Sequence, residues 1–157
     1  SIFAVEQGCV LVQGTINGYG ERCGNANLCS IIPTLQLKMN LNPLPEQKLK
    51  HLTEVSRYID EVANQIPKNN QPYVGNSAFA HKGGIHISAV QRHSSTYEHV
   101  APELVGNKRR ILLSELSGKS ALFAKAKEFK IDFEKDAKKV TELLKNLKEL
   151  EHLARMA

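Results

Sequence analysis

Residues 14–28 read GTINGYGERCGNANL, and this glycine-rich stretch decides how the fold is interpreted. An apolar run, VLV at residues 10–12, comes shortly before it, and an apolar helical pattern follows it. We expect a buried strand at 9–14 and a following helix that Asn25 or Asn27 caps. In α/β proteins, ligands bind at the turn after the C-terminal end of a strand. The stretch therefore predicts a βα unit with a candidate ligand site at its turn.

Helical patterns dominate the rest of the chain. Residues 1–8 are typical of a helix end that Gly8 closes. The clearest helix spans about 45–66, and its apolar residues recur at spacings of three and four on one predicted face: Leu49, Leu52, Val55, Ile59, Val62 and Ile66. The helix that Asn25 or Asn27 caps is expected to run to about Lys38. We expect further helices from Ile85, from Ser117 to about Lys130, and from Asp132. A short strand is expected at 111–113.

The bulk composition is that of a globular protein. The chain has 157 residues, of which 41% are apolar and 24% charged, enough for one domain with a core. It lacks the long apolar run that a membrane span needs, so we expect no membrane partner. Its three cysteines are odd in number and have no CxxC spacing, which indicates a reducing, cytoplasmic location. The start lacks a methionine and reads as a helix interior, so we expect a piece of a longer chain.

The net charge of +5 comes largely from the last third of the chain. A solvated helix face explains such charge most simply, and attraction to a polyanion is the alternative. A basic helical module that binds nucleic acid therefore stays open as a second function class. Aromatic residues make up only 6% of the chain and tryptophan is absent, so stacking platforms for single strands are poorly supplied.

Two motifs come close to nucleotide-binding sites and miss them. In GYGERCG, residues 18–24, the third glycine comes one residue too late for a dinucleotide fingerprint. Residues 118–120, GKS, resemble the end of a P-loop, but Leu113 stands where its first glycine is needed. Both nucleotide readings are set aside.

Two histidines and one asparagine are candidate functional residues. His81 and His86 are five residues apart, which does not place them on one helical face as in zinc-binding pairs. Two glycines precede Ile85 and His86, and they let the backbone approach another group closely. The Asn25 amide oxygen is a possible neutral ligand for a divalent metal, but the chain shows no obvious set of further ligands.

Two segments resemble one enzyme family. Residues 12–28 resemble the last barrel motif of the 2-isopropylmalate, homocitrate and citramalate synthases. SAFAHKGGIH at 77–86, continuing to TYE at 96–98 and PELVG at 102–106, resembles the subdomain that follows the barrel in that family. The variants GTINGYGERCGNANL and AFAHKGGIHISAV are most similar to the citramalate synthase branch.

The resemblance implies a mainly α fold with three parts. Residues 1–40 would be the incomplete last βα unit of a TIM barrel. Residues 41–75 would be a helical linker subdomain, and 76–157 a helical subdomain that carries the GIH motif.

The resemblance also implies an acyltransferase that condenses acetyl-CoA with a 2-oxo acid and hydrolyses the thioester. Pyruvate, giving citramalate, is the expected acceptor, and 2-isopropylmalate or homocitrate synthase activity is the alternative. A divalent metal (Zn, Mn or Mg) would chelate the oxo acid and stabilise the alkoxide. Asn25 matches one of its ligands, and the other ligands would lie outside this chain.

Residue roles follow from the same resemblance. His86 matches the base that removes a proton from the acetyl methyl group, and Tyr97 matches its catalytic partner. Glu21 and Arg22 match positions that orient the substrate beside the metal. In the family, the His and Tyr reach the barrel of the partner subunit, which implies a homodimer. No nucleic acid partner is implied, and the chain alone is expected to be inactive.

Overall fold

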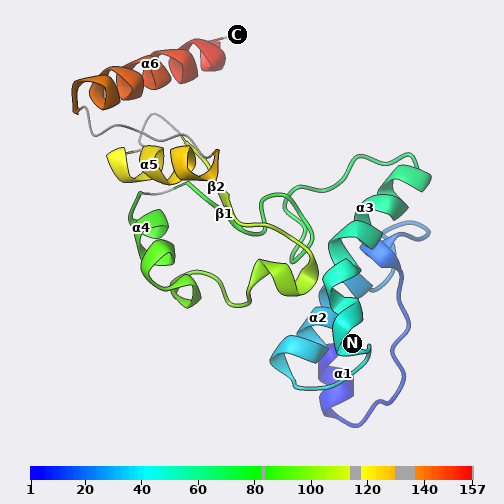
Figure 1. The fold of residues 1–157 in the computed structure, drawn as a ribbon. Coiled ribbons are helices and arrows are strands. Elements are labelled where there is room, and N and C mark those ends of the chain that lie inside the picture. Colours follow the sequence, from blue (N-terminus) through cyan, green and yellow to red (C-terminus); the bar gives the residue numbers. More distant parts are fainter. Residues whose placement is uncertain (83, 114–117, 130–136, 157) are drawn as a thin grey trace. The chain divides into compact units, whose positions relative to one another are not determined.

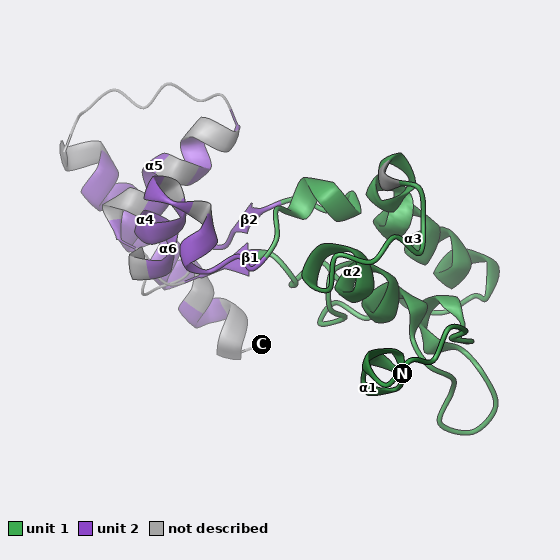
Figure 2. Ribbon diagram, turned by 90° about the horizontal axis from the view of Figure 1, so that it is seen from below, with its two compact units in different colours: residues 1–79, 100–108 green, residues 80–99, 109–157 purple. Residues whose placement is uncertain are grey.

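The computed structural model describes residues 1–82, 84–113, 118–129 and 137–156, which are mainly helical (Figure 1). The predicted mainly α class is therefore confirmed. The chain divides into two compact units that interleave along the sequence (Figure 2). Unit 1 comprises residues 1–79 and 100–108, and unit 2 comprises 80–99 and 109–157. The predicted division at residues 40 and 75 stays a prediction. Within the described ranges, every helix is too short or too polar to cross a lipid bilayer.

Unit 1 consists of helices and short 3-10 turns. Its elements are α1 (Ile2–Glu6), η1 (Ile16–Gly18), α2 (Leu28–Lys38), η2 (Glu46–His51), α3 (Leu52–Val62) and η4 (Pro102–Val105). The Asn27 side chain accepts a hydrogen bond from the Cys29 amide at 2.9 Å and so caps α2. Both predicted ends of this helix are confirmed.

The strand predicted at residues 9–14 is wrong. This segment has no regular structure, and Val10 and Leu11 are exposed. A strand needs a neighbour for its backbone N–H and C=O groups, and no described segment of this chain pairs with it. Only a single parallel bridge, between Thr15 and Asn27, joins the start of the turn to the start of α2.

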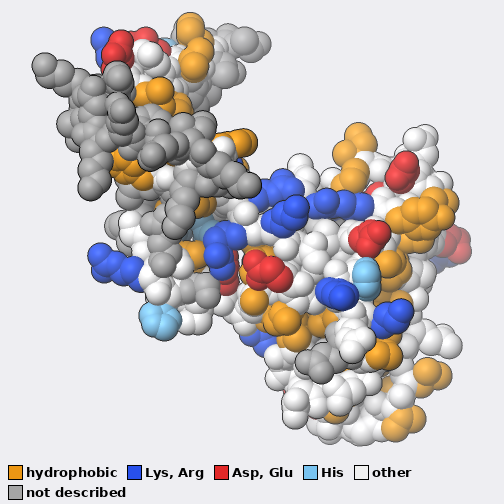
Figure 3. Space-filling model, in the orientation of Figure 1, with side chains coloured by type: hydrophobic (Ala, Val, Ile, Leu, Met, Phe, Trp, Pro, Cys, Tyr) orange, Lys and Arg blue, Asp and Glu red, His pale blue; other side chains and the backbone are white. Residues whose placement is uncertain are grey.

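The helix predicted at 45–66 is shorter, and only part of its predicted apolar face is buried, with Leu49 and Leu52 in the core. The 3-10 helix η2 precedes α3, and α3 ends at Val62. Val55, Val62 and Ile66 of the predicted apolar face are exposed, and the surface over α3 is rich in hydrophobic side chains (Figure 3). The side chains that α3 buries are one leucine and three polar residues: Leu52, Thr53, Ser56 and Asp60.

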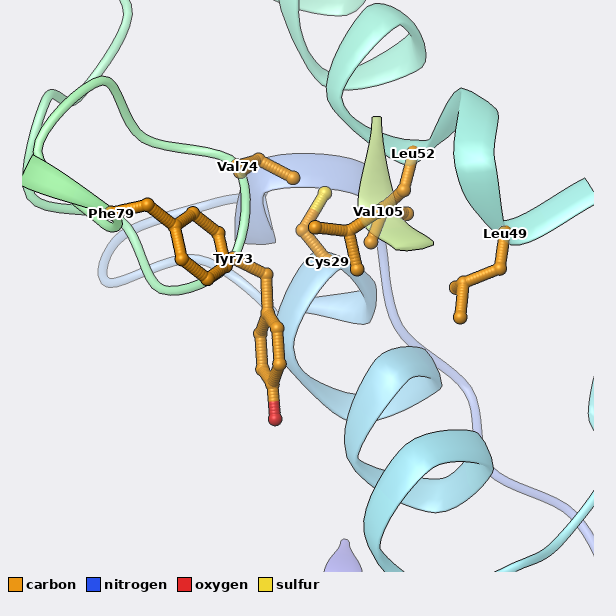
Figure 4. Close-up of a cluster of buried hydrophobic side chains, with 7 residues drawn as sticks. All are labelled: Cys29, Leu49, Leu52, Tyr73, Val74, Phe79 and Val105. Carbon is orange, nitrogen blue, oxygen red and sulfur yellow. The ribbon is translucent and has the colours of Figure 1, made fainter. Parts of the chain in front are cut away.

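The core of unit 1 joins segments that are distant in the sequence (Figure 4). Its buried members are Cys29, Leu49, Leu52, Tyr73, Val74, Phe79 and Val105. The Thr53 hydroxyl donates to the Val105 carbonyl at 2.7 Å. The Asn107 amide donates to the Tyr73 and Gly75 carbonyls at 2.8 and 3.0 Å. These bonds satisfy buried carbonyls and hold residues 100–108 in the core.

The described residues of unit 2 form a two-stranded parallel sheet, three α-helices and a 3-10 helix. Its elements are β1 (Ala80–His81), α4 (Gly84–Arg92), η3 (Ser94–Thr96), β2 (Arg110–Ile111), α5 (Lys119–Glu128) and α6 (Ala137–Met156). Ala80 pairs with Arg110 and His81 with Ile111. The strand predicted at 111–113 overlaps β2 only at Ile111, since β2 begins one residue earlier and ends two residues earlier.

The helices of unit 2 pack around a small core. Ile87 and Ala121 are buried there, with Ile111 and Leu113 packed against them. Helices α4 and α5 confirm the helices predicted from Ile85 and Ser117. The predicted helix start at Asp132, and with it Ser117 and Lys130, lies outside the described residues.

Candidate active site

His86 and Tyr97 lie ring to ring in unit 2. The ring centroids are 4.2 Å apart and the planes are tilted by 32°. His86 lies in the first turn of α4 and is exposed, whereas its neighbour Ile87 is only 1% exposed and anchors the helix in the core. Tyr97 follows η3 and is 48% exposed. Two residues that the motifs singled out are thus brought together on an accessible surface.

A buried carboxylate lies immediately after Tyr97 in the chain. The Glu98 side chain is 2% exposed, and its Oε1 is 3.0 Å from His81 Nε2 and accepts from Arg109 Nε at 2.6 Å. Its Oε2 accepts from Arg109 Nη2 at 2.5 Å. The guanidinium therefore grips the carboxylate with two parallel bonds, and a carboxylate can only accept, so His81 donates from Nε2.

The charge on Glu98 is stabilised where it lies. Burial by itself raises the pKa of the Glu98 carboxyl, but hydrogen bonds and charge attraction from Arg109 and His81 outweigh burial, and the pKa lies below its usual value. This cluster was not predicted from the sequence. The partners are distant in sequence, and neither spacing nor periodicity signals them.

The glycine-rich turn places Asn25 in unit 1. The Asn25 amide nitrogen donates to the Tyr19 carbonyl at 3.0 Å, and the Thr15 hydroxyl donates to the same carbonyl at 2.5 Å. A Cβ on Gly20 would lie 2.2 Å from the Asn25 amide nitrogen, so only glycine leaves room for that side chain. Gly24 has φ +90 and no space for a Cβ.

Glu21 and Arg22 extend from the tip of the same turn. Their side chains are 90% and 86% exposed, and the charged atoms are 3.9 Å apart. Such a surface pair adds little to stability and leaves both side chains accessible. Arg22 itself has a left-handed backbone, φ 55.

A buried polar network lies beneath this turn, and sequence analysis missed it. Asn17 has φ 60, and its amide donates to the Ser56 carbonyl at 2.8 Å and to Asp60 Oδ1 at 2.5 Å. Side chains of α3, α2 and the 68–72 loop complete it, with donors to the Asn17 amide oxygen from Ser56 (2.6 Å), Gln71 (3.1 Å) and Cys29 (3.3 Å). The network explains why α3 buries Ser56 and Asp60 as well as Leu52, while Val55 and Val62 of its apolar stripe stay exposed.

The network also perturbs two weak acids. The Tyr19 hydroxyl donates to Asp60 Oδ1 at 2.5 Å, and this bond raises the pKa of the Tyr19 phenol. Burial raises the pKa of the Cys29 thiol. Cys29 is therefore a structural residue of the core and not a nucleophile.

The described residues do not by themselves fit a metal ion. No group of three or more His, Cys, Asp or Glu side chains with suitable geometry occurs among them. Asn25 offers one neutral oxygen on an exposed turn, and one such ligand does not hold a divalent cation.

Comparison with known proteins identifies the family. The family model described as "Homocitrate synthase post-HMGL domain-like" matches residues 73–152, half of the chain. The matched range contains His86, Tyr97 and the whole Glu98 cluster. The chain belongs to this family.

Three curated relatives of this post-HMGL family member extend the match to nearly the whole chain. The (R)-citramalate synthase of Geobacter sulfurreducens is 57% identical over 97% of the chain and 29% of its own length. That of Synechocystis is 56% identical over 96% of the chain and 28% of its length. The 2-isopropylmalate synthase of Methanocaldococcus jannaschii is 40% identical over 96% of the chain and 29% of its length. The chain spans less than a third of the length of these relatives.

Proposed function

We propose that this chain is part of an acyltransferase that condenses acetyl-CoA with pyruvate to give citramalate. The ring contact between His86 and Tyr97 is the observation that carries the proposal, because it places a possible base beside a phenol on an exposed surface. Identities of 57% and 56% to named citramalate synthases favour pyruvate over the larger 2-oxo acids. The 2-isopropylmalate synthase at 40% supports the same reaction type with another acceptor.

The proposed chemistry uses the imidazole of His86 as a base. It takes a proton from the acetyl methyl group, and the resulting carbanion forms a bond to the keto carbon of the oxo acid. Tyr97 donates its hydroxyl proton to the new alkoxide oxygen, and its phenolate regains a proton from the protonated His86 imidazole. Hydrolysis of the thioester then releases free CoA and citramalate.

The remaining roles rest on the resemblance of residues 12–28. Asn25 would supply one oxygen to a divalent metal (Zn, Mn or Mg) whose other ligands belong to the part of the relatives that this chain does not span. Glu21 and Arg22 would orient the oxo acid beside it. We also propose that residues 1–40 complete a TIM barrel, and their exposed apolar side chains support this proposal. We further propose that the protein is a cytoplasmic homodimer in which His86 and Tyr97 act across the subunit boundary.

A chimera tests this function directly. This chain replaces the matching segment of the Geobacter sulfurreducens citramalate synthase, and release of free thiol is measured with pyruvate, 2-oxoisovalerate and 2-oxoglutarate. We expect turnover with pyruvate, and a loss of about 100-fold or more in kcat for His86→Ala. His152→Gln, which changes an exposed histidine of α6, is the control and retains activity.

Two results would overturn the proposal. One is a folded chimera without turnover, and the other is full activity of the His86→Ala and Tyr97→Phe variants. Preference for 2-oxoisovalerate or 2-oxoglutarate would keep the reaction type and reject pyruvate. The chain alone is expected to release no thiol.

A further inference from the structure

The Glu98 cluster connects the two chain segments that carry His86 and Tyr97. On one side, His81 ends β1 and leads into α4, where His86 lies in the first turn. On the other side, Glu98 is bonded directly to Tyr97 in the chain. The bond between His81 Nε2 and Glu98 Oε1, 3.0 Å long, therefore ties the start of α4 to the residue after Tyr97.

Arg109, from a third segment of the chain, also binds Glu98 and so stabilises the bond between His81 and Glu98. It precedes β2, whose pairing with β1 aligns His81 with Ile111, and the Leu112 amide donates to the His81 carbonyl at 3.0 Å. The guanidinium grips both oxygens of Glu98. A planar fork with two bonds fixes the orientation of a carboxylate, whereas a single charge fixes only its position.

Tyr97 and Glu98 point in opposite directions. The Glu98 side chain is 2% exposed and Tyr97 is 48% exposed, so the anchor points inward and the ring points outward. A second link runs from η3 to α4, since the Thr96 hydroxyl donates to the Ala89 carbonyl at 3.3 Å and also to the His93 carbonyl. The residues before and after Tyr97, Thr96 and Glu98, are thus both hydrogen-bonded, and they hold the Tyr97 ring beside α4.

We propose that the His81–Glu98–Arg109 cluster positions the Tyr97 ring against the His86 imidazole. Glu98 is a positioning residue in this account, because it acts through Tyr97. The consequence for catalysis rests on the proposed function, whereas the ring geometry does not.

Stability alone is a weaker explanation for the cluster. A buried ion pair is often no more stabilising than apolar residues of the same volume, although removal of one partner alone is costly. What the cluster supplies is a fixed direction for the chain at Tyr97. Burial alone raises the pKa of Glu98, and its lowered pKa supports this account because it reflects the hydrogen bonds and charges of Arg109 and His81.

The first test measures geometry in the 157-residue chain by NMR. In the unsubstituted chain we expect nuclear Overhauser contacts between the His86 and Tyr97 rings. In Glu98→Gln one of the two acceptor oxygens becomes an NH2 group, which faces an N–H donor of Arg109 in either orientation of the amide, and two donors cannot bond to each other. We expect loss of the ring contacts while the signals of Ile87 keep their native shifts. Glu149→Gln removes one exposed carboxylate of α6 and keeps the contacts.

Arg109→Lys is a second variant that tests the same proposal if Glu98→Gln does not fold. It keeps the positive charge and removes the fork, and we expect weaker ring contacts in a folded chain. Persistence of the ring contacts in both variants, with only a lower melting temperature, would overturn the proposal and leave the cluster a purely structural role.

The second test uses the chimera described above. We expect Glu98→Gln to lower kcat with pyruvate about 100-fold with KM little changed, because misplacement by about 1 Å costs that much. An equal loss in Glu149→Gln, or unchanged kcat in a Glu98→Gln variant that has lost the ring contacts, would reject the catalytic consequence. An inactive parent chimera would reject the proposed function, and the NMR result would still decide the positioning.

Discussion

Asn25 owes its place to the glycines around it. The side chain lies against the backbone of Gly20, and its amide nitrogen is bound by the Tyr19 carbonyl. The oxygen of a planar amide points away from its nitrogen, so this bond sets the direction of the one acceptor oxygen of the side chain. A single methyl group at Gly20 is enough to disturb that arrangement.

Gly20→Ala tests the arrangement. The new Cβ would lie 2.2 Å from the Asn25 amide nitrogen, and the flexible amide gives way more easily than the backbone. We expect shifted NMR signals of the Asn25 NH2 group and a change of less than about 1 kcal/mol in the free energy of unfolding. Gly118→Ala is the matched control, since no atom lies within 4 Å of the place that its new methyl group would take. Unshifted Asn25 signals would contradict this account.

At the residue scale, motif similarity and structure agree on His86 and Tyr97 as neighbours, though their roles stay predictions. Periodicity or composition would not have paired them, because one lies in a helix and the other after a 3-10 turn. Glu98 lies inside the TYE motif, yet the motif does not indicate its role. A buried ion pair forms only once distant segments meet, and sequence spacing does not encode that meeting.

Helix α3 shows why a helical period does not determine which face is buried. Its apolar residues recur as a core stripe should, yet Thr53, Ser56 and Asp60 point inward. Those polar groups find partners in Asn17 and in the Val105 carbonyl, so their burial leaves few donors unsatisfied. The period predicted the helix, and long-range hydrogen bonds selected the face.

The ladder between β1 and β2 is short, and the Glu98 cluster reinforces it. The two strands pair over only two residues each, and His81 and Arg109 bind the same carboxylate beside them. Acid should therefore loosen unit 2 by protonating Glu98.

Stability against urea at several pH values tests this. The pKa of Glu98 in the folded chain lies below the unfolded value of about 4.3. The ionised carboxylate therefore contributes fully to the free energy of unfolding above about pH 4.3, and this contribution is lost as the pH falls through the folded pKa. We expect the unsubstituted chain to be more stable than Glu98→Gln at pH 7, with the difference shrinking below pH 4. The NMR signal of Ile87 reports on unit 2. A difference that stays constant with pH would contradict the prediction, and Glu149→Gln is the control for lost charge.

At the scale of the whole molecule, unit 1 leaves apolar surface uncovered. Val10, Leu11 and Leu41 are exposed and line an apolar groove together with side chains of α2: Leu28, Ile31, Ile32 and Leu35. Residues 9–14 pair with no described strand, and an exposed apolar groove of this kind is typical of an interaction surface.

We therefore expect the chain to self-associate through this groove. In sedimentation experiments, the double variant Val10→Lys, Leu11→Lys should associate at least about tenfold more weakly, since burying one such side chain is worth about 1.5–3 kcal/mol. Gln7→Lys adds positive charge at a nearby exposed polar site and serves as the control. A strictly monomeric chain, or equal association of all variants, would contradict the prediction.

The interleaving of the two units limits how this chain can be divided. Val105 completes the core of unit 1 and Asn107 binds the Tyr73 and Gly75 carbonyls, although the intervening residues 80–99 belong to unit 2. A break in the gene within codons 80–99 would separate Val105 and Asn107 from the rest of unit 1 and would also divide unit 2. Recombination within this segment therefore disrupts both units at once.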